Sequence, residues 1–136
     1  MKPEIKEAIL KNAINLDTSF TRNFAYLKKD TLNLIPVLSD NGIAIVAIDI
    51  LEKRENDRYK IQDGNWNIQR DLYPQLKTNP ISESILNDIK QSNTLAQNYI
   101  ENFDYQDDVV FSIISLIPHD EWTAEFGHLF PLSSRN

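Results

Sequence analysis

Gly42-Ile43-Ala44-Ile45-Val46-Ala47-Ile48-Asp49-Ile50-Leu51 is an apolar run interrupted by a single carboxylate. Side chains of a strand point alternately to its two faces, so a continuous apolar run rich in β-branched residues predicts a strand covered on both sides. We therefore expect residues 43–51 to form the centre of a sheet. Asp49 needs a hydrogen bond, an ion pair or contact with water. Capping of a neighbouring turn is its favoured role, and a direct binding role is the alternative.

Two further segments are predicted to complete the sheet. Residues 58–70 follow a charged turn and are interrupted at Gly64, which is typical of a bulge and would turn Trp66 towards the core. Residues 109–117 form a second continuous apolar run. Because a helix separates this run from the preceding hairpin, its strand can return beside residues 43–51.

Three segments have helical spacing of apolar residues, namely residues 3–14, 30–40 and 80–103. Residues 15–29 show no clear period and are predicted to be a polar link with aromatic anchors. The expected order is α-α-β-β-α-β. The fold class is therefore predicted to be α+β, with a small, mainly antiparallel sheet packed against helices.

The chain of 136 residues fits one domain, residues 1–136, because a chain of this length buries about two thirds of its unfolded surface. Residues 118–136 hold several aromatic side chains and are expected to pack on the body as a C-terminal tail. No apolar run approaches the roughly 18 residues that a membrane helix requires, so no membrane partner is predicted. The sequence begins without a secretory pattern and contains 0 cysteines, which favours a cytoplasmic protein.

Charge is distributed unevenly along the chain. The net charge is −6, yet residues 91–134 contain no lysine or arginine. This asymmetry argues against nucleic acid as a partner and favours a basic protein partner, although a solubilising surface is an equal alternative. The predicted contact set combines acidic side chains of this segment with one aromatic anchor: Asp104, Asp107, Asp108, Asp120, Glu121, Trp122 and Glu125.

Signatures of catalysis are missing from the sequence. Its 3 glycines cannot build a phosphate-binding loop. The two histidines, His119 and His128, have a spacing that matches no compact metal site, and we predict neither a metal nor a cofactor. Ser112 and Ser115 lack the flanking glycines of a nucleophile elbow. An enzyme is therefore the minority hypothesis.

Several short motifs recur in the order of one known family. They are Gly42 followed by Ala47-Ile48-Asp49-Ile50, then Gly64-Asn65-Trp66, then Tyr99-Ile100-Glu101-Asn102-Phe103 before an apolar strand. In this order, over about residues 5–117, the chain resembles the immunity protein forty family of bacterial polymorphic-toxin systems of the contact-dependent inhibition or type VI type. The motif positions carried over are Asp49, Asn65, Trp66 and Tyr99.

This resemblance implies a protein without catalysis that binds the C-terminal domain of a cognate secreted toxin and neutralises it in the cytoplasm. Many such toxins are basic nucleases, which an acidic surface would complement. An alternative is a small acidic adaptor or regulatory domain without a toxin partner. A third hypothesis is an enzyme that uses His119, Asp120 and His128. The oligomeric state is left open.

Overall fold

The computed structural model describes residues 1–17, 22–54, 59–61, 66–67, 83–104 and 109–130. The helices in this part of the chain are α1 (Pro3–Leu10), α2 (Lys28–Asp40), α4 (Glu83–Asn102), α5 (His119–Phe126) and the short 3-10 helix η2 (Gly127–Leu129). The strands are β1 (Ile14–Asp17), β2 (Arg22–Ala25), β3 (Ile45–Lys53), β4 (Tyr59–Ile61), β5 (Trp66–Asn67) and β6 (Val109–Ser115). The predicted α+β class is confirmed, with two small antiparallel sheets.

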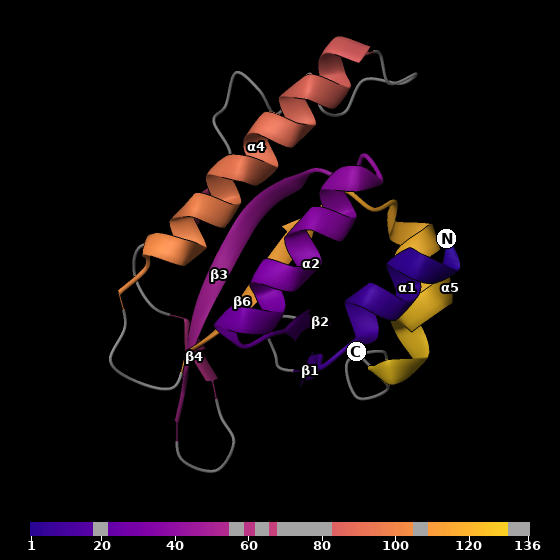
Figure 1. Cartoon of the computed structure of the whole chain (residues 1–136). Helices are drawn as coiled ribbons and strands as arrows, with labels where there is room; N and C mark the ends of the chain where they lie inside the picture. Colours follow the sequence, from indigo (N-terminus) through magenta and orange to yellow (C-terminus); the bar gives the residue numbers. More distant parts are fainter. Residues whose placement is uncertain (18–21, 55–58, 62–65, 68–82, 105–108, 131–136) are drawn as a thin grey trace.

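Strand β3 is the centre of the larger sheet, as its sequence predicts. Strand β6 runs antiparallel to β3 along most of its length, with Asp49 opposite Ser112. Strands β4 and β5 pair with the other edge of β3. Figure 1 shows β3 as a long strand with α4 beside it, α2 in front of β6, and α1 and α5 together on the opposite side of the view from α4. The expectation that the second apolar strand returns beside the first is confirmed.

The main core lies on one face of β3. Ile48 and Ile50 point to this face and are fully buried. Ile45 joins them although it is three residues before Ile48, because the pairing with β6 shifts between Ile45 and Ala47 and an irregularity of this kind turns side chains to the other face. Helices α2 and α4 and strand β6 supply further members of this core: Leu34, Ile35, Leu38, Ala96, Ile100, Phe111 and Ile113.

Helix α4 is attached to the beginning of β3 by buried side-chain hydrogen bonds. Asn93 is 1% exposed; its Nδ2 donates to the carbonyl of Ile43 at 2.9 Å, and its Oδ1 accepts from the backbone N–H of Ile45 at 2.9 Å. The hydroxyl of Ser92 donates to the carbonyl of Ile45 at 3.3 Å. A carboxamide offers the same donor and acceptor as a peptide group. Asn93 therefore replaces a neighbouring strand where β3 begins.

The segment predicted as a polar link contains the second sheet, a hairpin of β1 and β2 with Ile14 opposite Ala25. This hairpin is joined to β6 through an antiparallel bridge between Tyr26 and Phe111. Its alignment is reinforced by Asn23, whose Nδ2 donates to the hydroxyl of Ser112 and to the carbonyl of Ile113, both at 3.1 Å. The expectation of an irregular link was wrong for these residues.

Element boundaries differ modestly from the prediction. Helix α1 ends at Leu10 rather than at residue 14, because Asn12 has a φ of 57°, in the left-handed region that interrupts a helix. The predicted helix 80–103 is observed as α4, Glu83–Asn102. The predicted strand 58–70 is seen as β4 and β5, and the expected bulge at Gly64 lies outside the described residues.

The C-terminal helices pack into the same core as the sheet. Phe126 and Phe130 are buried and meet Phe24 of β2 with ring centroids 5.4 and 5.2 Å apart. The pair of Phe24 and Phe126 is edge to face, which is a favourable aromatic geometry. Residues 119–130 therefore contribute to the core of the body.

Replacement of Asn93 tests the attachment of α4 to β3. Asn93→Ala leaves the partly buried carbonyl of Ile43 and the buried N–H of Ile45 without their partner, so the free energy of unfolding should fall by about 2–4 kcal/mol. The measurement is urea unfolding followed by circular dichroism. Asn98→Ala is the matched control, because Asn98 is exposed on the same helix. Its effect should stay within about 0.5 kcal/mol, and an equal loss in both variants would contradict the role given to Asn93.

Candidate functional site

The acidic side chains predicted to form one contact set lie in two separate places. Asp104 follows the C-terminal end of α4 and is exposed, whereas Asp120, Glu121 and Glu125 belong to α5. Figure 1 shows the end of α4 and helix α5 on opposite sides of the view. Asp107 and Asp108 lie outside the described residues. The residues of the predicted contact set are therefore divided between at least two separate surfaces.

Two of the acids on α5 are engaged with the N-terminal part of the chain. The ammonium group of Lys6 lies 2.9 Å from a carboxylate oxygen of Glu125, and the amino group of Met1 lies 3.4 Å from Glu121. The hydrogen bond from Lys6 holds the pKa of the Glu125 carboxyl below its usual value. Helices α1 and α5 are thus joined by opposite charges, and Glu125 already has a cation beside it.

Trp122, the predicted aromatic anchor, packs inside the protein. Its ring stacks on Phe130 at 5.4 Å between centroids and lies 5.7 Å from Phe126 and 6.2 Å from Phe24. The side chain is half-buried. These contacts give Trp122 a structural role in the aromatic cluster of the C-terminal helices.

The end of α4 presents a different arrangement. Glu101 and Asp104 are both exposed. The ammonium group of Lys28, in the first turn of α2, donates to the carbonyl of Glu101 at 3.0 Å, and Gln97 donates to the Glu101 carboxylate at 3.2 Å. A cation at the C-terminal end of a helix is favourable because the last carbonyls lack helical partners. This contact fixes the start of α2 against the end of α4.

Asp49 is a half-buried carboxylate in the middle of β3, opposite Ser112 of β6. It lies between Ile48 and Ile50, whose side chains point to the other face. Burial raises the pKa of the Asp49 carboxyl above its usual value. Within the described part of the chain, no turn-capping hydrogen bond of Asp49 is observed.

The other motif residues are placed as follows. Trp66 lies in β5 with its backbone opposite Ile48, and Asn65 lies outside the described residues. Tyr99 is half-buried against the main core, 6.1 Å from the ring of Phe103, and burial raises the pKa of its hydroxyl. Phe103 in turn meets Phe111 edge to face at 6.0 Å. The end of α4 is thus anchored to β6 by aromatic side chains.

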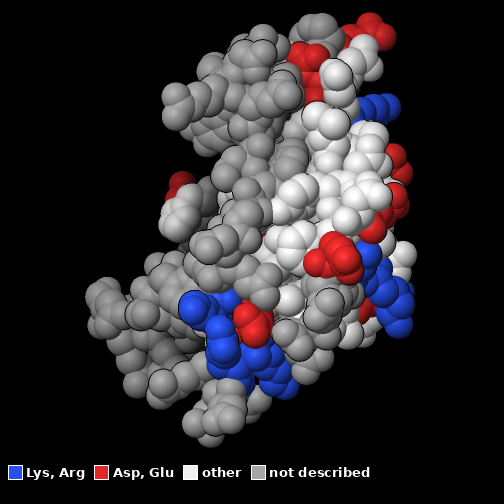
Figure 2. Space-filling view, turned by 90° about the vertical axis from the view of Figure 1, so that its left-hand side faces the viewer, with Lys and Arg blue, Asp and Glu red and all other residues white. Residues whose placement is uncertain are grey.

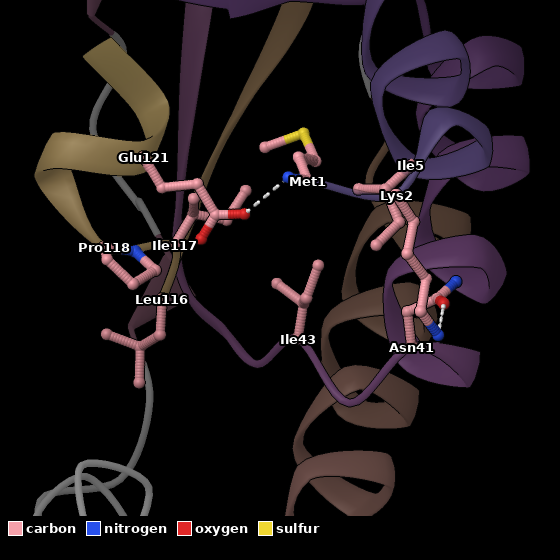
Figure 3. Close-up of a pocket in the computed structure, with 9 residues that line it drawn as sticks. All are labelled: Met1, Lys2, Ile5, Asn41, Ile43, Leu116, Ile117, Pro118 and Glu121. Atoms are coloured by element: carbon pink, nitrogen blue, oxygen red, sulfur yellow. Dashed lines mark hydrogen bonds and ion pairs between the residues drawn. The ribbon is translucent and has the colours of Figure 1, made fainter. Parts of the chain in front are cut away.

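A cavity of about 360 Å³ lies between α1, α5 and the ends of the two central strands (Figure 3). Its walls are mainly aliphatic, and Lys2 at its rim donates to Asn41 at 3.4 Å. The lining residues are Met1, Lys2, Ile5, Asn41, Ile43, Leu116, Ile117, Pro118 and Glu121. These side chains do not combine a nucleophile with a neighbouring base, which nucleophilic catalysis requires.

Basic side chains gather at the base of the face shown in Figure 2, over the hairpin of β3 and β4. Lys53 ends β3 and is followed by Arg54, and Lys60 of β4 lies opposite Glu52. Arg54 lies 3.4 Å from Glu52. His119 and His128 are exposed. Among the described residues, no group of at least three His, Cys, Asp or Glu side chains could hold a metal ion, and no helix is long and apolar enough to cross a membrane.

Comparison with known proteins decides the family. The model of the family described as Immunity protein 40 matches residues 12–115, from the hairpin of β1 and β2 to the end of β6. The chain belongs to the immunity protein 40 family. No curated protein and no solved structure matches the chain. Membership confirms the resemblance seen in the sequence and implies neutralisation of a cognate toxin.

The family also bears on the question of catalysis. Immunity proteins typically act by binding a toxin and not by catalysing a reaction, which confirms the prediction that the chain is not an enzyme. The matched region contains Asp104 but ends before α5. The acids of α5, together with Trp122, therefore lie outside the part of the chain that defines the family.

Substitution of Asp49 tests the effect of burial on its carboxyl. Because its pKa is raised, the folded state holds the proton more tightly than the unfolded state does. The Asp49 carboxyl therefore favours folding below its unfolded pKa and disfavours it as pH rises through the folded pKa. Asp49→Asn should raise the free energy of unfolding at pH 7 relative to the native protein, and this difference should shrink at pH 3. Urea unfolding of both proteins at pH 7 and at pH 3 measures this difference. An equal difference at the two pH values would contradict a raised pKa of the Asp49 carboxyl.

Proposed function

We propose that the chain binds the C-terminal domain of a cognate secreted toxin and neutralises it by protein–protein contact in the cytoplasm of the producing cell. The observation that carries the proposal is the family match over residues 12–115. The geometry is compatible with it, because the described surface combines exposed charged residues with a rigid core and no assembled catalytic group. Neutralisation by contact needs only a stable surface of matching shape and charge.

We assign the principal contact to the acidic end of α4. Asp104, with Asp107 and Asp108 that follow it in sequence, forms this group. Three observations favour this group at the end of α4 over the predicted contact residues of α5, which are Asp120, Glu121, Trp122 and Glu125. Glu125 is paired with Lys6, Trp122 is packed among phenylalanine rings, and α5 lies outside the family match. Glu121 and Glu125 would then act within the protein by holding its N-terminal part through Met1 and Lys6.

The toxin we propose is a basic nuclease. A surface that binds phosphates must be rich in lysine and arginine. An acidic group on the immunity protein attracts such a surface, speeds association and occupies the place of the nucleic acid. The absence of lysine and arginine from residues 91–134 supports this proposal, since the end of α4 lies in that segment. The fold adds Lys28 of α2 at Glu101, so the acidic contact is assigned to Asp104 and the acids that follow it in sequence.

Charge reversal at Asp104 tests the contact. An immunity gene should follow directly after the gene of its toxin, so the toxin domain encoded directly upstream is the test partner. Asp104→Lys should weaken binding of this domain by about tenfold or less, mainly through slower association, and should flatten its salt dependence. The measurement is surface plasmon resonance at two salt concentrations. Asp40→Lys is the matched control, because Asp40 is also exposed at the end of a helix and the net charge changes equally. A lysine at either helix end suits the helix dipole, so neither variant should unfold.

Two outcomes would contradict the proposal at different levels. If co-expression of the chain fails to rescue growth of cells that produce the upstream toxin domain, neutralisation of that toxin is wrong. If rescue succeeds but Asp104→Lys and Asp40→Lys behave alike, the toxin is bound through another surface.

A further inference from the structure

The most exposed large apolar side chain of the described residues belongs to Leu27, immediately before α2. It is 54% exposed, compared with 38% for Leu10 at the end of α1. A single exposed leucine is common and needs no explanation by itself. Leu27 differs from an ordinary exposed leucine in the hydrogen bonds that hold its backbone and in its position next to the end of α4.

Leu27 occupies a position at which another type of residue would stabilise the helix. It is the N-cap residue of α2, and no side-chain hydrogen bond caps the first turn. Serine, threonine, aspartate and asparagine are preferred there because their side chains accept a hydrogen bond from a free N–H. Leucine makes no such bond. Helices α1 and α5 also begin without a side-chain cap, at Lys2 and Pro118, so the missing cap does not single Leu27 out, but it offers a polar substitution that should not destabilise the fold.

The backbone of Leu27 is held firmly although its side chain is exposed. Its carbonyl accepts hydrogen bonds from the backbone N–H and from the hydroxyl of Thr31, both at 2.9 Å. On one side, Tyr26 pairs with Phe111 through two backbone hydrogen bonds of 2.9 and 2.8 Å. On the other side, Lys28 contacts the carbonyl of Glu101. Leu27 is therefore presented on a rigid support, which lowers the entropy lost on binding.

The same contacts bring Leu27 to the acidic end of α4. Phe111, which pairs with the residue before Leu27, meets the ring of Phe103. Lys28, the residue after Leu27, touches Glu101. Glu101, Phe103 and Asp104 all belong to the last turn of α4 or follow it directly. The start of α2, with Leu27 followed by Lys28 and the exposed Lys29, therefore lies next to the end of α4.

We infer that Leu27 is the apolar anchor of the toxin contact, with Glu101 and Asp104 as its charged rim. This inference rests on the proposed function and adds the centre of the interface to it. Interfaces concentrate their binding energy in a few desolvated side chains surrounded by polar ones. The partner surface that fits is an apolar depression bordered by charges of both signs, because Lys28 and the exposed Lys29 follow Leu27 directly while Glu101 and Asp104 end α4. Leu27, Glu101 and Asp104 all lie within the residues matched by the family.

Leu27→Ser separates binding from folding. The serine removes the apolar anchor and supplies the missing N-cap, so the melting temperature should stay equal or rise. Affinity for the purified toxin domain encoded directly upstream should fall about tenfold or more, through faster dissociation. The salt dependence of binding should not change, because no charge is altered. Leu10→Ser is the matched control and should leave affinity within about twofold, since Leu10 lies at the end of α1.

The outcomes distinguish this inference from the proposed function. Native protein that binds the toxin domain, together with a Leu27→Ser variant that binds equally well, would overturn the anchor and leave the function standing. Equal weakening by Leu27→Ser and Leu10→Ser would also overturn it. If the native protein does not bind the toxin domain, the proposed function fails, and the anchor fails with it.

Discussion

The hydrogen-bonding requirement of β3 controls the rest of the structure. This strand is buried, so its backbone groups need partners on both edges. Strand β6 supplies them on one edge, and β4 and β5 supply part of the other. At the beginning of β3 the remaining groups are satisfied by Asn93. Asn93 and Ser92, together with the apolar face of α4, therefore fix where the long helix lies, and with it the position of the exposed acids at its end.

The charges of the protein serve two purposes. On α5, Glu125 holds α1 through Lys6 and so closes the aromatic cluster of the C-terminal helices. At the end of α4, Glu101 and Asp104 remain exposed, next to the start of α2 that Lys28 joins to Glu101. A carboxylate that is paired with a neighbouring cation, as Glu125 is with Lys6, attracts a distant partner less than a carboxylate without such a pair does. This difference is why we place the toxin contact at α4.

The strands and helices with strong apolar patterns could be predicted from the sequence. Residues 43–51 and 109–117 are long apolar runs, and α4 has a clear helical period. The hairpin of β1 and β2 could not be predicted, because its strands have 4 residues each and owe their alignment to distant partners such as the Asn23 to Ser112 contact. Short strands carry too little alternation to be recognised without that context.

The candidate site was only partly predictable for a related reason. Position in sequence grouped Asp104 with Glu125, whereas the end of α4, which Asp104 follows, and helix α5, which holds Glu125, lie on opposite sides of the view in Figure 1. Buried polar residues left a signal that could have been used: Ser92 and Asn93 lie between the apolar positions Ile89 and Ala96 of α4. Polar side chains on the buried face of a helix indicate hydrogen bonds to other elements.

Hydrogen–deuterium exchange of the chain with and without the upstream toxin domain tests the central claim most directly. The first N–H groups of a helix lack helical partners and exchange readily when they are exposed, so the start of α2 reports sensitively on being covered. The account predicts that the toxin slows exchange at the start of α2 and the end of α4 and leaves α1 and α5 unchanged. Slowing confined to α1 and α5, or no slowing at all, would contradict it.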